Sequence, residues 1–123
     1  MLQANWFRSK WLATGWFIIM CILFFLPGSA LPKENSWMTI IHIDKLVHVG
    51  LFAVLLFLCR SSFSWSIDHY NVFLLLLALF YGFSVEIIQR EWVPGRSFDL
   101  FDVAADMTGS IAGILVWLWA YKK

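Results

Sequence analysis

Four long apolar runs, separated by short polar breaks, constrain the fold of this chain more than any other feature of its sequence. A helix needs about 20 residues to cross roughly 30 Å of hydrocarbon, and the second run reaches that length only when it extends back through Asp44. No run shows the period-2 alternation of a barrel strand, so helices are the structures that satisfy this backbone in lipid. The sequence therefore predicts an all-α four-transmembrane-helix bundle, forming a single membrane domain over residues 1–123. The predicted spans are approximately 11–26, 44–60, 70–89 and 99–121.

The composition agrees with a bilayer environment. Hydrophobic residues make up 61% of the chain and charged residues only 14%, whereas ordinary soluble domains are about 25% charged. Aromatic residues reach 19%, with eight Trp, and such rings favour the zone between headgroups and tails. The net charge is +1 and the Lys and Arg residues are scattered, so the basic field that nucleic acid binding needs is absent. We expect the membrane lipid bilayer, and no nucleic acid, as a partner.

The cysteines and histidines do not predict a metal or a cofactor. Cys21 and Cys59 lie in apolar runs, where a thiol behaves as a small hydrophobe, and their spacing fits neither a disulfide framework nor a metal site. His42 and His69 lie outside the predicted helix face of His48. We therefore predict no metal and no cofactor.

The first run also has an alternative interpretation. Arg8 and Lys10 precede the apolar stretch, and Gly28-Ser29-Ala30 follows it, which resembles a secretory signal with a small-residue cleavage site. Cleavage within residues 1–30 would leave three spans and move the N-terminus across the membrane.

Charge asymmetry predicts the orientation of a four-span chain. Both termini and the loop near residues 60–70 then share one side, which carries five Lys and Arg residues against one Asp. The other side carries four cations against seven carboxylates. Because cytoplasmic loops are enriched in Lys and Arg, we expect cytoplasmic N- and C-termini and an acidic extracytoplasmic side.

Polar side chains from three predicted spans meet at this acidic side. Asp44 and His48 are four residues apart and stack on one helix face, one turn inside the second span. Glu86 and Gln89 are three residues apart at the end of the third span, which reaches the same depth. The beginning of the fourth span completes the group.

A single stripe on the fourth span combines acidic and small residues. Its members follow a 3-4-3-4 spacing: Asp99, Asp102, Asp106, Gly109 and Gly113. Small residues four apart let a neighbouring helix approach closely in a membrane, so the glycines are predicted to face the bundle interior and to carry the aspartates inward. A carboxylate near the centre of a span costs roughly 2.5–3.5 kcal/mol and usually marks a site.

Each of these residues also has a structural interpretation. Asp99 and Asp102 fit N-terminal charges that the helix dipole favours, whereas Lys45 and Arg90 fit interfacial anchors or cations that offset the carboxylates. His48 and Gln89 fit hydrogen-bonded packing residues. The convergence of so many charges at one end favours a polar functional cluster, which we predict to consist of Asp44, Lys45, His48, Glu86, Gln89, Arg96, Asp99, Asp102 and Asp106. Gly109 and Gly113 are predicted to serve helix packing.

An ordered set of short motifs carries a family resemblance over residues 44–113. The motifs are Asp44-Lys45-x-x-His48, Glu86-x-x-Gln89, Pro94-Gly95-Arg96 and Asp99-x-x-Asp102 leading to Gly109. Together they resemble the VanZ-like membrane protein family. Where that family commonly has Asn, this chain has Asp106, and the added carboxylate can bind a proton or a cation.

The resemblance implies a protein of the bacterial inner membrane, linked through the family's name to teicoplanin resistance. We expect a non-enzymatic protein that binds an amphiphilic or lipid-linked cell-wall precursor and alters glycopeptide susceptibility. One alternative is an enzyme in which His48 and Glu86 act as acid and base on a lipid-linked phosphate or ester, with Arg96 stabilising negative charge. A second alternative is a structural subunit bound to another membrane protein.

Overall fold

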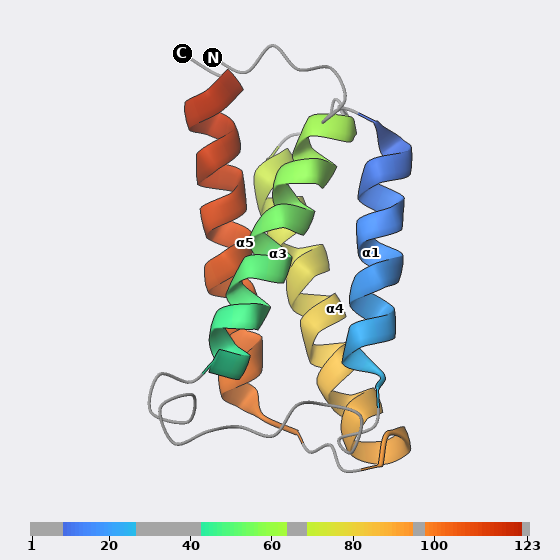
Figure 1. Ribbon diagram of the computed structural model, residues 1–123. Helices are drawn as coiled ribbons and strands as arrows, with labels where there is room; N and C mark the ends of the chain where they lie inside the picture. Colours follow the sequence, from blue (N-terminus) through green and yellow to red (C-terminus); the bar gives the residue numbers. More distant parts are fainter. Residues whose placement is uncertain (1–8, 27–42, 64–68, 95–97, 122–123) are drawn as a thin grey trace.

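The computed structural model describes residues 9–26, 43–63, 69–94 and 98–121, with side chains for all of these except residues 43 and 44. These residues form four α-helices and no strand: α1 (Lys10–Phe24), α3 (Ile43–Ser62), α4 (Tyr70–Trp92) and α5 (Leu100–Tyr121) (Figure 1). The all-α prediction is confirmed for this part of the chain. Successive helices run in opposite directions, so the C-terminal ends of α1 and α4 lie beside the N-terminal ends of α3 and α5. We call this the lower end, as drawn in Figure 1, and the opposite one the upper end.

Three of the helices are long and apolar enough to cross a membrane, namely α3 over Lys45–Ser62, α4 and α5. The fourth, α1, has 15 residues and a length of about 22 Å at 1.5 Å per residue, which is shorter than the predicted span of 11–26. It ends because Phe25 leaves the helical conformation, with its N–H donated to the Cys21 carbonyl. Pro27 follows in the sequence and disfavours helical backbone at the residue before it.

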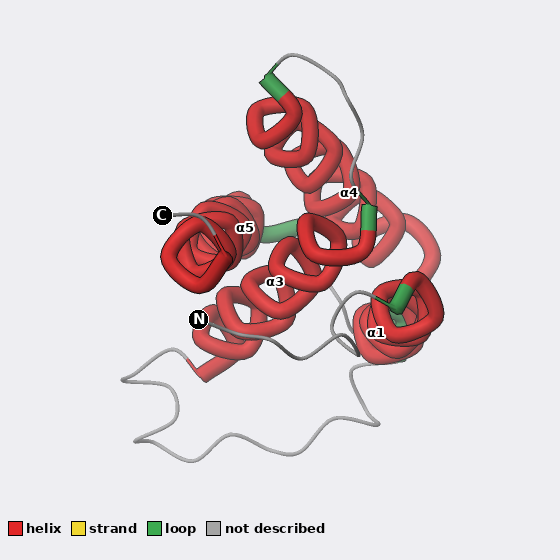
Figure 2. Tube along the Cα trace, turned by 90° about the horizontal axis from the view of Figure 1, so that it is seen from above, coloured by secondary structure: helices red, strands yellow, loops and turns green. Residues whose placement is uncertain are grey.

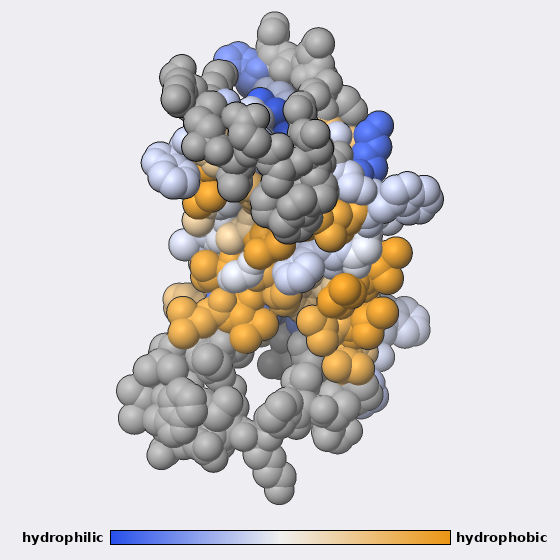
Figure 3. Space-filling view, turned by 45° about the horizontal axis from the view of Figure 1, so that its top comes forward, coloured by the Kyte–Doolittle hydropathy of each residue, from blue (hydrophilic) through white to orange (hydrophobic). Residues whose placement is uncertain are grey.

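Large hydrophobic side chains cover the outside of the helices. Trp11 is 86% exposed, Phe80 74% and Trp119 83%. Figure 3 shows hydrophobic side chains over much of the described part of the face in view, with hydrophilic ones toward its upper end. Exposed aromatic residues lie at both ends of the bundle, with Trp11 and Trp119 at the upper end and Trp92 and Phe101 at the lower end. This distribution matches aromatic belts at two membrane interfaces.

The closest helix pair is α3 with α5. A Cβ added at Gly109 would overlap the backbone carbonyl of Val49, and one added at Gly113 would overlap that of Ala53. Because the two glycines and their two partners are each four residues apart, the contact repeats once per turn along both helices. Seen from above, α3 lies between α1 and α5, and α4 extends beside it toward the side of α1 (Figure 2).

A shared core holds the other helices to this pair. Its buried residues come from all four helices: Met20, Phe24, Phe52, Leu55, Leu56, Tyr70, Leu74, Ala78, Val85 and Ile114. The indole Nε1 of Trp16 donates a hydrogen bond to the carbonyl of Leu51 at 3.0 Å, which joins α1 to α3. Near the middle of the bundle, the Phe52 and Tyr81 rings lie 5.5 Å apart between centroids. This aromatic layer lies between the polar residues of the lower end and the apolar core above them.

Candidate functional site

His48 and Asp106 form a buried pair between α3 and α5. The Nδ1 of His48 lies 2.6 Å from Oδ1 of Asp106, and the two residues are 6% and 1% exposed. Since a carboxylate accepts hydrogen bonds, Nδ1 donates, and Nε2 of the neutral ring keeps its lone pair. The Phe24 ring stacks on the imidazole with centroids 5.0 Å apart. Together these contacts fix the direction in which Nε2 points.

Glu86 joins the cluster from α4. The residue is fully buried, and its Oε1 accepts a hydrogen bond from the backbone N–H of Asp99 at 3.0 Å. Its Oε2 is also buried and has no hydrogen-bond partner among the described residues. Leaving a buried polar atom unpaired costs about 1–3 kcal/mol, so this oxygen marks a position for a proton or a ligand.

The beginning of α5 adds two carboxylates that Lys45 holds together. Oδ1 of Asp99 accepts the N–H of Phe101 at 2.9 Å, which is an N-cap contact. The Lys45 Nζ on α3 lies 2.5 Å from Oδ2 of Asp99 and 2.7 Å from Oδ1 of Asp102. Lys45 therefore ties the beginning of α3 to the beginning of α5.

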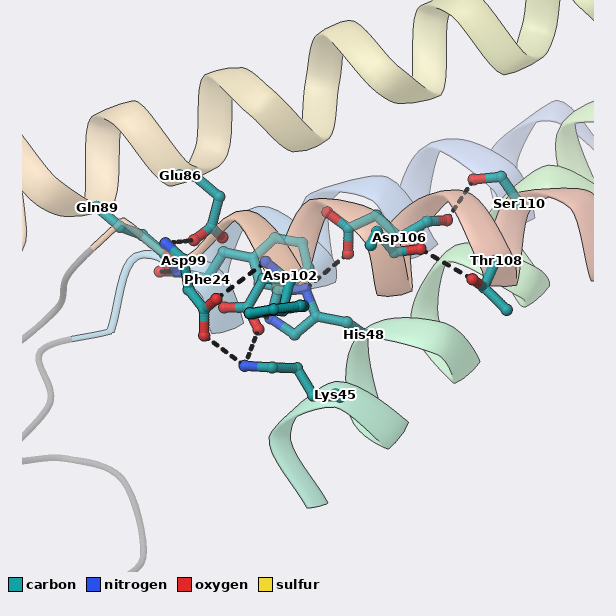
Figure 4. A network of polar contacts seen from close by, with 12 residues as sticks. Phe24, Lys45, His48, Glu86, Gln89, Asp99, Asp102, Asp106, Thr108 and Ser110 are labelled. Carbon is teal, nitrogen blue, oxygen red and sulfur yellow. Dashed lines mark hydrogen bonds and ion pairs between the residues drawn. The ribbon is translucent and has the colours of Figure 1, made fainter. Parts of the chain in front are cut away.

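The free atoms of three side chains from three helices face one another at the lower end (Figure 4). One nitrogen or oxygen atom from each of His48, Glu86 and Asp102 lies within 4.8 Å of the other two. Within this group, Nε2 of His48 is 3.8 Å from Oδ2 of Asp102. The helices thus converge on one small polar space.

The site also includes Phe24 and Gly82, which the sequence did not indicate. Gln89 donates through Nε2 to the carbonyl of Phe24 at 2.7 Å, so the end of α1 closes one side of the cluster. Nothing distinguishes Phe24 from other aromatic residues of its apolar run in the sequence. On α4, a Cβ added at Gly82 would lie 2.6 Å from Oδ2 of Asp106, so glycine gives this carboxylate room. That Oδ2 is buried without a hydrogen-bond partner in the described part of the chain.

Most of the predicted cluster lies in one place. The structure brings together Lys45, His48, Glu86, Asp99, Asp102 and Asp106, with Gln89 beside them. Arg96 and the side chain of Asp44 lie outside the described residues. Arg90 pairs with Glu91 at 2.8 Å, and both side chains are more than half exposed. Among the described residues, this exposed pair forms no ion pair with the carboxylates of the cluster.

The arrangement is suited to holding a cation or moving a proton. Four carboxylates, one lysine and one histidine make up its ionisable groups within the described residues. An imidazole oriented by a carboxylate is also the geometry of a general acid or base. Among the described residues, however, no hydroxyl or thiol hydrogen-bonds to His48: the Ser110 Oγ donates to the carbonyl of Asp106 at 2.8 Å, and Cys59 lies toward the upper end.

Comparison with known proteins identifies the family. No curated protein and no solved structure matches this chain. A sequence model described as VanZ/LLP1 matches residues 3–121, nearly the full chain, which confirms the resemblance carried by the motifs at the lower end. The chain therefore belongs to the VanZ/LLP1 family.

Proposed function

We propose that this chain is a multi-pass protein of the bacterial inner membrane that binds the headgroup of an amphiphilic or lipid-linked envelope component. Such binding would alter susceptibility to glycopeptides such as teicoplanin. The observation that carries the proposal is the fully buried Glu86, whose Oε2 has no hydrogen-bond partner among the described residues. Ionisable groups inside a membrane bundle are costly, and they mark ligand sites or polar pathways by default.

The distribution of charge supports an extracytoplasmic position for the cluster. The upper end carries Lys10 and Arg60, and the Arg60 guanidinium lies 3.9 Å from the centroid of the Trp117 ring. The lower end carries the carboxylates, together with Lys45 and Arg90. The positive-inside rule counts only Lys and Arg, and with five of them predicted on the side of the upper end and four on the other, it favours a cytoplasmic position for the upper end. The polar cluster then meets the outer leaflet, where headgroups of lipid-linked wall precursors are exposed.

An apolar groove supports a place for the tail of such a ligand. It has a volume of about 280 Å³ and lies between α1, α3 and α4, lined by Ala13, Thr14, Phe17, Leu55, Leu56, Cys59, Phe63, Leu74, Leu77, Ala78 and Tyr81. Tyr81, at the lower limit of this groove, has its ring centroid 6.3 Å from that of Phe24, and Phe24 in turn stacks on His48. A tail in the groove and a headgroup at the cluster would thus be separated by one layer of aromatic rings.

A second candidate function is an acid–base enzyme acting on a lipid-linked phosphate or ester. The hydrogen bond between Asp106 and His48 favours it, because it leaves Nε2 directed toward Asp102. With no nucleophilic side chain bonded to His48 in the described residues, water would be the attacking group. Release of a labelled headgroup by the purified protein, lost on His48→Gln, would distinguish this function from binding alone.

The binding proposal is tested with the full chain, purified into nanodiscs from the membranes of the host bacterium. Native mass spectrometry then identifies amphiphiles that remain bound. Glu86→Gln removes the buried charge at nearly constant shape, and Glu91→Gln is the matched control, because it removes an exposed charge from the same end of α4. We expect Glu86→Gln to lose the bound amphiphile and the control to keep it.

A teicoplanin susceptibility assay extends the test to cells. Strains that express equal amounts of membrane-inserted wild type or Glu91→Gln should share one susceptibility, and Glu86→Gln should match the empty vector. Equal amphiphile binding by both variants, or no retained amphiphile in any sample, would refute the proposed site.

A further inference from the structure

We propose that His48, Glu86 and Asp102 form a binding site for one divalent transition-metal ion of the class of Mn²⁺ or Zn²⁺. The ligand atoms are one imidazole nitrogen and two carboxylate oxygens, which lie within 4.8 Å of one another. They come from three different helices, so no spacing motif along the chain predicts this ligand set. Glu86, whose buried Oε2 has no hydrogen-bond partner among the described residues, supplies one of these oxygens.

Each of the three side chains has one polar atom engaged by the protein and another left for the shared space. Glu86 uses Oε1 to accept the backbone N–H of Asp99. Asp102 uses Oδ1 to bind Lys45, and its Oδ2 faces His48. His48 uses Nδ1 to bind Asp106. Such anchoring orients ligands before a metal arrives, which lowers the ordering cost of binding.

The contact between His48 and Asp106 has a specific role in this site. Histidine ligands of metals almost always donate their other ring N–H to a carboxylate or a carbonyl, which fixes the tautomer and raises the basicity of the ligating nitrogen. Here Nδ1 donates to the buried Asp106 at 2.6 Å, and Nε2 is the atom turned toward Asp102. Asp106 is therefore a positioning residue and not a ligand.

The geometry fits a metal after a small contraction. Ligand atoms about 2.1 Å from a metal lie roughly 3.0–3.4 Å from one another, against 3.8 Å between Nε2 of His48 and Oδ2 of Asp102. Because the three ligand atoms spread over up to 4.8 Å, the ends of the acidic side chains have to move inward by up to roughly 1.5 Å. Imidazole favours Zn²⁺, Fe²⁺ and similar ions, and carboxylates suit Mn²⁺. Three protein ligands leave coordination positions open.

Charge balance gives an independent reason for a dication. Within the described cluster, the carboxylates of Glu86, Asp99, Asp102 and Asp106 face the single ammonium of Lys45. Among the described residues this leaves more acid than base, which disfavours direct contact of these carboxylates with a phosphate headgroup. A bound dication reverses the local field, and a phosphate oxygen can then take an open coordination position. This last step rests on the proposed function, but the metal site itself does not.

The test uses Mn²⁺ alone with the full chain, stripped of metal and held in lipid-free detergent. Electron paramagnetic resonance counts the free Mn²⁺ during a titration, and pulsed measurements detect coupling to an imidazole nitrogen. We expect one saturable Mn²⁺ per chain, with nitrogen coupling and displacement by Zn²⁺. Glu86→Gln and Asp102→Asn should each weaken binding at least about tenfold, and Asp106→Asn should weaken it by roughly 10–100-fold.

The control is Glu91→Gln, which changes the net charge as Glu86→Gln does, at an exposed position. It should leave the Mn²⁺ affinity within about twofold. Circular dichroism of every sample confirms that the helices remain, and Asp102→Asn replaces Glu86→Gln if the latter does not fold. Failure of the wild type to bind one saturable Mn²⁺, absence of nitrogen coupling, or equal weakening by Glu91→Gln would each overturn the metal site. None of these results depends on an amphiphile, so the proposed binding function is judged separately.

Discussion

Gly109→Ala tests whether the backbone contact between α3 and α5 controls the stability of the bundle. The new Cβ would overlap the carbonyl group of Val49, which is backbone and cannot rotate away. To restore ordinary contact distances for carbon and oxygen, α5 has to move by roughly 1.2–1.5 Å. Overpacking of this kind costs about 1–3 kcal/mol, and the helix preference of Ala returns up to about 1 kcal/mol. We expect the free energy of unfolding to fall by about 1–2 kcal/mol.

The matched control is Gly50→Ala on α3, where an added Cβ meets nothing within 4 Å. This variant should gain up to about 1 kcal/mol, because only helix preference changes. Both free energies are measured by titrating the protein in mixed micelles with dodecyl sulfate and following the far-ultraviolet circular dichroism. A Gly109→Ala protein as stable as wild type, or one that gains as much as Gly50→Ala, would show that the helices do not need this close contact.

Three further changes test individual contacts with the same unfolding titration. Gln89→Leu leaves the Phe24 carbonyl without its hydrogen-bond donor and should lower the free energy of unfolding by about 1–3 kcal/mol. An unchanged unfolding midpoint would argue against a stabilising hydrogen bond between α4 and α1. Trp16→Phe keeps an aromatic ring but loses the hydrogen bond to Leu51. We expect the free energy of unfolding to fall by about 1 kcal/mol and hydrogen exchange in α1 to become faster. Exchange as slow as in the wild type would contradict the role of the indole. Lys45→Met leaves two aspartates without their shared ammonium; because both pairs are partly exposed, the loss should be about 1 kcal/mol or less and should shrink in high salt.

The helical periodicity of the sequence predicts which residues share a face, and this part of the site could be foreseen. Asp102, Asp106 and Gly109 lie on one stripe because the spacing of 3.6 residues per turn is fixed by backbone geometry. The depth at which His48 and Glu86 meet also follows from the order of the apolar runs. Both inferences need only the local geometry of a helix and the alternation of direction between helices.

The pairing of atoms could not be foreseen, because it depends on how the helices rotate and tilt against one another. In the sequence Lys45 fits an interfacial anchor better than a partner for carboxylates, whereas the folded chain places it between Asp99 and Asp102. Gly82 and Phe24 had no visible role, since each contacts the cluster from a helix whose orientation depends on packing. The early end of α1 reflects local backbone geometry at Phe25, which hydrophobicity does not encode.

The shortness of α1 has a consequence for the surrounding bilayer. Its last helical residue, Phe24, stacks on His48, which lies in the second turn of α3. At the lower end, α1 therefore stops about one helical turn short of the depth at which α3 begins. A hydrophobic segment shorter than the hydrocarbon thickness is accommodated partly by thinning of the adjacent lipid. Thinning along this flank would bring the adjacent headgroups nearer to the depth of the imidazole, so that phospholipids diffusing past α1 would approach the acidic residues sideways from within the membrane plane.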